Sequence, residues 1–289
     1  MNAECTADEA PEGPIRPGVP VRLSARIWRV TCGNRGLMTG PGTNTYLVGA
    51  GDQWAVIDPG PVDAAHLAVL LASAPGPIRT VLVTHTHPDH SPLAMALGAA
   101  TGAQLLGRRS GHGSTQDTTF APRRELADGD RLIVGDATLR VIHTPGHASN
   151  HLCYLLEQER LLFTGDHVIQ GSTVVIDPPD GDMAAYLASL ERLLDEPLEC
   201  LAPGHGALIP EPRAALTALI RHRRAREAKT LMAVRTGPAD LRSLLARVYD
   251  DVPAHLHRLA ERSLLAHLLK LEQEGRARRA GDLWSGSAS

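Results

Sequence analysis

The chain has 289 residues, of which 43% are hydrophobic and only 3% aromatic, and its formal net charge is −3. This length and apolar content predict one large domain, or a large and a small one, with a core built mainly from aliphatic side chains. No apolar run approaches the length of about 18 residues that a membrane span needs, which excludes the classes of protein that cross the bilayer as helices.

The N-terminal segment is acidic and rich in proline, and it lacks the apolar stretch of a secretion signal. We therefore predict a flexible tail over residues 1–20 and a cytoplasmic protein without membrane contact. The cysteines lie far apart and form no C-x-x-C pair, which favours reduced thiols. They are Cys5, Cys32, Cys153 and Cys200.

The next two hundred residues alternate segments typical of strands with segments typical of helices, in two similar halves. This interleaving predicts a layered α/β fold. In the first half we expect strands at 22–30, 44–49, 54–60 and 79–85, and helices at 64–73 and 93–102. In the second half we expect strands at 131–135, 137–144, 151–156, 160–166 and 198–206, and a helix at 182–194. The long polar segment 107–122 between the halves predicts a functional loop.

The pattern changes after residue 210. Apolar spacing predicts three helices, at 213–234, 238–249 and 254–275, followed by a short hairpin at 276–284. From Glu211 onward, 15 basic and 9 acidic residues give a charge of +6, whereas the preceding residues carry −9. This asymmetry suggests two modules, and we predict a main domain over 21–210 and a small helical domain over 211–289.

Histidines and acids cluster where the expected strands end. The sequence VTHTHPDHSP at 83–92 holds three histidines and an aspartate, and three later strands end in TPGH, FTGD and APGHG. Ligand crevices of α/β folds lie at such strand ends. Imidazole nitrogen together with carboxylate oxygen suits zinc or a similar first-row ion. Alternate residues of an extended chain share one face, so His85 and His87 can grip one ion together, and the turn that follows can direct Asp89 and His90 towards a second.

In their order, these motifs resemble those of the metallo-β-lactamase-fold hydrolases, whose pattern is H-x-H-x-D-H followed by a histidine, an aspartate and a histidine. The resemblance covers roughly residues 21–210. It implies an α/β fold, a four-layer αββα sandwich, with a binuclear metal site at one edge of its two sheets. The ions would be two divalent metals, zinc foremost, with iron and manganese as alternatives.

The resemblance also implies a role for each residue of the motifs. The first ion would be held by three histidines, here His85, His87 and His147. The second would be held by Asp89, His90 and His205, and Asp166 would bridge both ions. Asp58, in the segment VIDPG, matches an early aspartate of the family that braces the metal loop from behind.

These residues predict metal-dependent hydrolysis. A metal-bridging hydroxide, oriented by Asp89 and Asp166, would attack an electrophilic phosphorus or carbonyl carbon. The leaving group would take its proton from metal-bound water or from His151, for which a bracing role behind the ligands is the alternative reading.

Two further stretches narrow the branch of the family. The segment GPGTNTYLVG near the start and the C-terminal run from 245 to 275 are similar to the β-lactamase-like protein 2 family. This resemblance implies a small winged-helix-like domain after the hydrolase, and the animal relatives are described as single-strand endoribonucleases. One departure is visible: Ser91-Pro92-Leu93 stands where many members have Ser-Gly-Gly, which bears on the shape of the substrate beside the site.

Three functions follow as hypotheses. The leading one is hydrolysis of phosphodiester bonds in single-stranded RNA, and the second is acyl hydrolysis of thioesters or lactones. The third is a non-enzymatic winged-helix binder of nucleic acid, which the complete set of seven ligands disfavours. A small molecule or RNA is thus the expected substrate. Nucleic acid remains open as a partner of the basic C-terminal domain, and so does a homo-oligomer.

Overall fold

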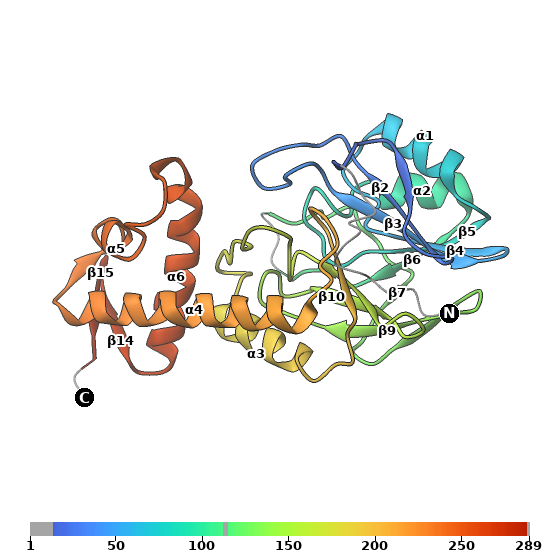
Figure 1. Cartoon of the computed structure of the whole chain (residues 1–289). Coiled ribbons are helices and arrows are strands. Elements are labelled where there is room, and N and C mark those ends of the chain that lie inside the picture. The colour runs from blue at the N-terminus through green and yellow to red at the C-terminus, as the bar shows by residue number, and fades with distance from the viewer. Residues whose placement is uncertain (1–13, 112–114, 288–289) are drawn as a thin grey trace. The chain divides into compact units, whose positions relative to one another are not determined.

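The computed structural model describes residues 14–111 and 115–287 of the chain (Figure 1). The described residues form two compact units. The first contains residues of Met1–Thr144, Asn150–Ser172 and Glu196–Arg213, and the second contains residues of Pro145–Ser149, Thr173–Asp195 and Ala214–Ser289. No helix among the described residues is both long enough and apolar enough to cross a bilayer.

The first unit contains a seven-stranded sheet in which the strands follow one another in chain order. Its strands are β1 (Pro20–Arg22), β2 (Ile27–Thr31), β3 (Asn44–Ala50), β4 (Gln53–Ile57), β5 (Ile78–Leu82), β6 (Gln104–Gly107) and β7 (Arg124–Glu125). Neighbours from β1 to β4 pair antiparallel, and those from β4 to β7 pair parallel. Helices α1 (Ala64–Ser73) and α2 (Ala94–Thr101) make the crossovers that the parallel strands need.

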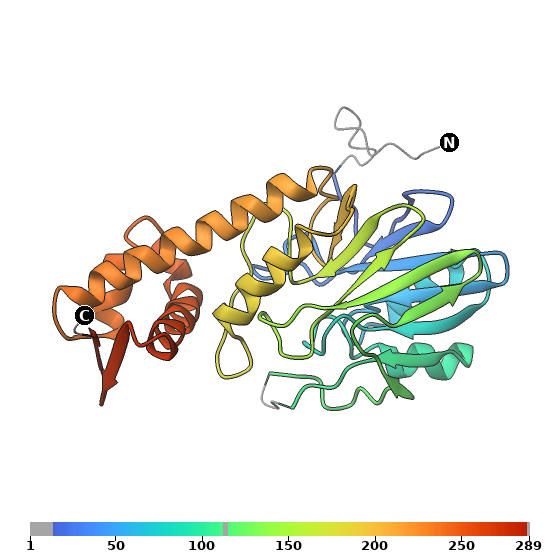
Figure 2. The same cartoon turned by 90° about the horizontal axis from the view of Figure 1, so that it is seen from below.

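A second sheet of five strands completes the first unit (Figure 2). Its order is β12-β11-β10-β9-β8, and only β11 and β12 are parallel. The strands are β8 (Arg131–Val134), β9 (Ala137–His143), β10 (Leu152–Leu156), β11 (Leu161–Gly165) and β12 (Cys200–Pro203).

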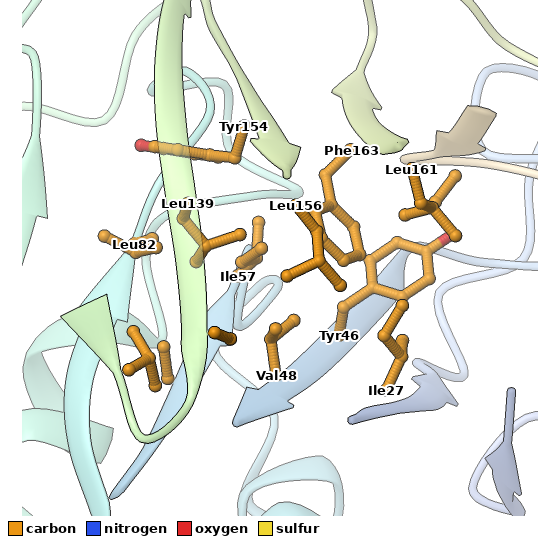
Figure 3. Close-up of a cluster of buried hydrophobic side chains, with 14 of the residues drawn as sticks. Ile27, Tyr46, Val48, Ile57, Leu82, Leu139, Tyr154, Leu156, Leu161 and Phe163 are labelled. Atoms are coloured by element: carbon orange, nitrogen blue, oxygen red, sulfur yellow. The ribbon is translucent and has the colours of Figure 1, made fainter. Parts of the chain in front are cut away.

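Alternating side chains of the first sheet supply two separate cores. Tyr46 and Val48 of β3 point to one face and pack with Leu139, Leu156 and other residues of the second sheet (Figure 3). Because successive side chains of a strand point to opposite faces, Leu47 lies on the other face and packs with Leu70 and Leu97 of the two helices. These cores fix a helix layer and two sheet layers.

The second unit contains helices and a small antiparallel sheet. The helices are α3 (Met183–Leu193), α4 (Pro212–Arg235, most of it in this unit), α5 (Leu241–Val248) and α6 (His257–Gln273), and a 3₁₀ turn at Ala254–Leu256 precedes α6. The sheet has the order β13-β15-β14, with β13 (Ala239–Asp240), β14 (Ala277–Ala280) and β15 (Leu283–Gly286). Leu244, Leu268 and Trp284 meet in a core of their own, as a helical domain with a hairpin wing requires.

The predicted elements agree with these results in most places. The helix over 64–73, the hairpin around Gly51 and the C-terminal hairpin are present, and the α/β class with a winged-helix-like domain is confirmed. The sequence did not predict the short strands β1, β6, β7 and β13. They have two to four residues each, which is too short for a hydrophobic period to show.

The core between the two sheets can be tested in one hairpin. Leu139 is fully buried there, whereas Ile133 on the neighbouring strand β8 is 68% exposed. We expect Leu139→Ala to lower the free energy of unfolding by about 2–5 kcal/mol, because it leaves a cavity. Ile133→Ala should change it by about 0.5 kcal/mol or less. Urea unfolding followed by circular dichroism measures both, and equal losses would contradict the assigned core.

Candidate metal centre

Six of the seven predicted ligands lie in the first unit, at the carboxyl ends of its strands. The loop after β5 carries the first four, Asp166 follows β11, and His205 lies two residues beyond β12. These loops meet at one edge of the two sheets, so residues separated by more than a hundred positions become neighbours. The four on the loop after β5 are His85, His87, Asp89 and His90.

One group of donors comprises Asp89, His90, Asp166 and His205, whose ligand atoms lie within 4.8 Å of one another. The Nε2 atom of His90 lies 3.4 Å from Asp166 Oδ1 and 3.6 Å from Asp89 Oδ2. The Nε2 atom of His205 lies 3.3 Å and 3.2 Å from the same two oxygens. Two donors of one tetrahedral ion, with bonds of about 2.0–2.1 Å, would lie about 3.3 Å apart, so these separations suit a shared cation.

A second group contains His85 and His87 together with the same Asp166. The Nε2 atom of His85 and the Nδ1 atom of His87 lie 2.9 Å apart. Burial lowers the pKa of His85 well below its ordinary value, which keeps this imidazole neutral, as a metal ligand must be. Asp166 belongs to both groups and could therefore bridge two ions.

His147, the seventh predicted ligand, lies in the segment Pro145–Ser149 of the second unit. Its Nδ1 atom lies 2.8 Å from the Val175 carbonyl oxygen in the same unit. A carbonyl only accepts hydrogen bonds, so Nδ1 donates and Nε2 carries the lone pair. The role of His147 as a ligand stays a prediction.

Asp58 sets the orientation of two imidazoles. Its Oδ2 accepts hydrogen bonds from His90 Nδ1 at 2.9 Å and from the Thr84 hydroxyl at 2.7 Å, and its Oδ1 accepts from the Thr84 N–H. The hydroxyl, having given its hydrogen to Asp58, can only accept from His85 Nδ1 at 3.0 Å. In the neutral form, both histidines therefore carry the lone pair on Nε2, the atom that faces the donor groups.

The backbone of Asp58 adopts φ +51°, a left-handed conformation that costs about 1–2 kcal/mol for a residue with a Cβ. The three hydrogen bonds to its carboxylate give a reason for retaining an aspartate there. Thr84, the residue that passes this bracing on to His85, was missed by the sequence analysis. Its position directly before the H-x-H motif was the available signal.

Residues 42–45 (GTNT), at the start of β3 and just before it, brace the segment around His205. The side-chain amide of Asn44 donates to the carbonyls of Pro203 and Gly206, and His205 Nδ1 lies 3.2 Å from the Gly42 carbonyl. This carbonyl fixes Nε2 as the lone-pair nitrogen of His205 in the same way.

Glycines let these loops approach closely. A Cβ on Gly204 would lie 2.8 Å from His90 Cε1 and 2.9 Å from Asp166 Oδ1. A Cβ on Gly165, whose φ is +46°, would lie 2.5 Å from the Thr84 hydroxyl. The glycines before Asp166 and His205 are therefore required by the close packing around the ligands.

His151 lies behind the donor groups. Its Nε2 accepts a hydrogen bond from the Asp166 N–H at 3.2 Å, and its Nδ1 lies 2.9 Å from the Thr144 hydroxyl. The side chain is fully buried. These contacts fit a residue that positions Asp166, the bracing alternative for His151, and its predicted part in proton transfer stays untested.

The long loop after β6 packs on the metal-binding loop. The hydroxyl of Thr86 donates to Gln116 at 2.6 Å, the N–H of Asp117 donates to the Thr86 carbonyl, and the Ser91 hydroxyl donates to Asp117. Ser91 begins the Ser-Pro-Leu departure noted in the sequence. His112, which the sequence places in this loop, falls outside the described residues.

The electrostatics fit a cation site. Burial by itself would lower the pKa of His205, but Asp166 and Asp89 raise it to about 10. They raise the pKa of His90 as well, against the effect of its burial. The Nε2 atoms of His90 and His205 form no hydrogen bond with any part of the chain that the structure describes. Buried nitrogens of this kind, facing carboxylates, are the donor set that divalent transition metals bind.

The sequence matches two known families in the places that the fold suggests. Residues 38–205 match the Metallo-beta-lactamase superfamily, and residues 241–284 match the Beta-lactamase associated winged helix domain. The chain belongs to the metallo-beta-lactamase superfamily. This superfamily member is a hydrolase with a histidine and aspartate cluster for divalent metal ions.

Similar proteins support the same assignment. A "Beta-lactamase-like protein 2 homolog" from Drosophila melanogaster is 32% identical over 89% of this chain and 91% of its own length. An "Atrochrysone carboxyl ACP thioesterase" from Aspergillus chevalieri is 30% identical over 86% of this chain and 81% of its own. A beta-lactamase domain protein from Burkholderia ambifaria shares the fold, with a TM-score of 0.82, 22% identity and 96% of each chain covered. The resemblances found in the sequence are thereby confirmed.

The bracing by Asp58 gives a prediction about metal affinity. Asp58→Asn replaces one accepting oxygen by an amide N–H, which faces the Thr84 N–H in one orientation of the amide and His90 Nδ1 with the Thr84 hydroxyl in the other. Either orientation weakens the bracing of the imidazoles. We expect about 10- to 100-fold weaker metal binding, measured by competition with a chromophoric chelator. Asp52→Asn, in the exposed turn between β3 and β4, is the control and should bind as wild type. Unchanged affinity in Asp58→Asn would refute the bracing role.

Proposed function

We propose that this protein hydrolyses an acyl thioester with the aid of two divalent cations, zinc foremost. The proposal is carried by the two donor groups that share Asp166. We assign His147 to the first group, with His85 and His87, because the order of motifs matches the superfamily. Asp89, His90 and His205 form the second group.

Two cations in these groups would supply an ionised water near neutral pH and would polarise the bond to be cleaved. The residues of the chain do the remaining work. Asp89, which is 25% exposed at its side chain, faces solvent and can orient the attacking water. His151 holds the backbone N–H of Asp166, so that this carboxylate keeps its place between the groups.

The distribution of aromatic residues favours a thioester over RNA. The chain has nine Phe, Trp and Tyr residues. Eight of them are buried, and the ninth, Trp28, is half-buried. Proteins that hold single-stranded nucleic acid usually stack its bases on exposed aromatic rings, and this surface offers none among the described residues.

The net charge of the first 210 residues also favours a thioester over RNA. The first 210 residues, which carry the six ligands of the first unit, have a net charge of −9, and a polyanion would be repelled there. The relative from Aspergillus chevalieri is named an "Atrochrysone carboxyl ACP thioesterase", which also favours a thioester. The basic C-terminal residues remain the reason to test RNA as the alternative substrate.

The proposal is tested with a panel of acyl thioesters and a fluorescent single-stranded RNA, each with the metal-loaded protein. We expect thioester turnover and no RNA cleavage. Asp89→Ala removes a member of the second donor group, so it should lower turnover by at least about 100-fold, the most that is typical for the loss of a residue behind the ligands. Asp136→Ala, an exposed carboxylate between β8 and β9, should leave turnover unchanged.

Two outcomes would contradict the proposal in different ways. Metal-dependent cleavage of RNA without thioester turnover would reject the substrate class and retain the metal centre. Turnover in Asp89→Ala equal to that of the wild type would reject the catalytic use of the donor groups.

A further inference from the structure

The segment that carries His147 is built on helix α3 of the second unit. The Asp182 N–H donates to the Gly146 carbonyl at 2.8 Å, and the Ser189 hydroxyl donates to the Pro145 carbonyl at 2.8 Å. A Cβ on Gly146, whose φ is +140°, would lie 2.3 Å from the backbone of Tyr186. This close approach leaves the backbone of the segment little freedom.

The imidazole of His147 depends on one more contact. Its Nδ1 atom donates to the Val175 carbonyl at 2.8 Å. Metal-binding histidines commonly give their second ring N–H to a carbonyl or carboxylate, which fixes the tautomer and the ring orientation. The position of Val175 therefore decides where His147 Nε2 points.

Residues 174–177, around Val175, are held by helices of the C-terminal region. Arg223 of α4 donates from Nη2 to the Val174 carbonyl. The Ile176 N–H donates to the hydroxyl of Ser263 of α6 at 3.3 Å. The first contact fixes the peptide group before Val175. The second fixes the peptide group that contains the Val175 carbonyl itself, because the Ile176 N–H belongs to it.

The burial of Arg223 indicates a specific role for it. Its side chain is only 3% exposed, and no carboxylate in the described chain pairs with it. Its contacts are the Val174 carbonyl and the ring of Tyr186, with Cζ 5.3 Å from the ring centroid. A buried guanidinium without a carboxylate is costly. By contrast, its neighbour Arg224 is exposed and pairs with Glu191.

We propose that Arg223, assisted by Ser263, is a positioning residue of the metal centre. By holding residues 174–177 it fixes the Val175 carbonyl, and through it the tautomer and direction of the His147 imidazole. The C-terminal helices would thus orient one of the predicted metal ligands, His147, which lies in the same unit as they do. This inference rests on the proposed function, in which His147 is a ligand.

The test measures metal binding instead of turnover, in the full-length protein. Zinc stoichiometry and the two zinc affinities are determined for wild type, Arg223→Gln, Ser263→Ala and the reference variant His147→Ala. We expect Arg223→Gln to weaken one ion by about 10- to 100-fold and to leave the other at its wild-type affinity. Arg223→Lys can still donate to the Val174 carbonyl, so it should restore most of the loss.

Arg221→Gln is the matched control, because Arg221 lies on the same helix and is exposed; it should bind both ions as wild type. If Arg223→Gln does not fold, Ser263→Ala carries the test. Wild-type affinity for both ions in folded Arg223→Gln and Ser263→Ala would overturn the inference. Equal weakening of both ions, with a lower unfolding temperature, would also overturn it in favour of a general structural role.

The reference variant separates this inference from the proposed function. Retention of both ions by His147→Ala would show that His147 is not a ligand, and the first metal site as proposed would fail. Loss of one ion in His147→Ala, with no loss in Arg223→Gln, would reject only the role of Arg223.

Discussion

The carboxylate of Asp58 is the constraint on which the metal centre depends. It accepts three hydrogen bonds, one from His90 and two from Thr84. The Thr84 hydroxyl in turn accepts a hydrogen bond from His85 Nδ1. One buried acid thereby fixes the tautomers of two imidazoles that belong to different donor groups. Because the backbone of Asp58 is in a left-handed conformation, the turn after β4 has to be held in place by these same contacts. The same hydrogen bonds therefore stabilise the strained turn and orient the metal-binding histidines.

The same device is used for other histidines with backbone carbonyls in place of a carboxylate. His205 donates to Gly42 and His147 to Val175. In each case Nδ1 donates to a backbone carbonyl, which places the lone pair of the neutral ring on Nε2. Neutral carbonyls orient a ring without adding negative charge, so the charge of the centre comes mainly from Asp89 and Asp166. Carboxylate oxygens of these two acids lie 3.2–3.6 Å from the Nε2 atoms of His90 and His205. The hydrogen bonds to the Nδ1 atoms hold these two rings in place, although burying charged groups is costly.

Helices of the C-terminal region contact the residues on either side of Val175, whose carbonyl accepts from His147. The segment of His147 and residues 173–195 belong to the same compact unit as the winged-helix-like domain. A domain of that kind usually suggests nucleic acid, yet the described surface has no exposed aromatic ring for bases, and its buried arginines are engaged in the protein interior. Arg223 contacts a carbonyl, and Arg226 pairs with Asp251 and lies over Tyr249. These two side chains are therefore engaged within the second unit and do not offer their guanidinium groups to phosphate.

The sequence by itself determined the α/β class, the two kinds of module and the set of residues with metal-binding chemistry. Hydrophobic period and glycine placement are local properties, so the hairpin at Gly51 and the helix over 64–73 could be predicted from them. The order of the motifs carried the resemblance to the family.

Only the tertiary structure decided how these residues are held. Thr84, Asn44 and Arg223 are ordinary residue types without a motif, and their roles arise from partners that are distant in sequence. Asn44, for example, reaches the carbonyls of Pro203 and Gly206, more than 150 positions away. His151 shows the same limit: its spacing allowed two roles, and the position of its Nε2 against the Asp166 N–H depends on packing between strands. Hydrogen-bond direction is a property of the folded arrangement, and a sequence pattern does not contain it.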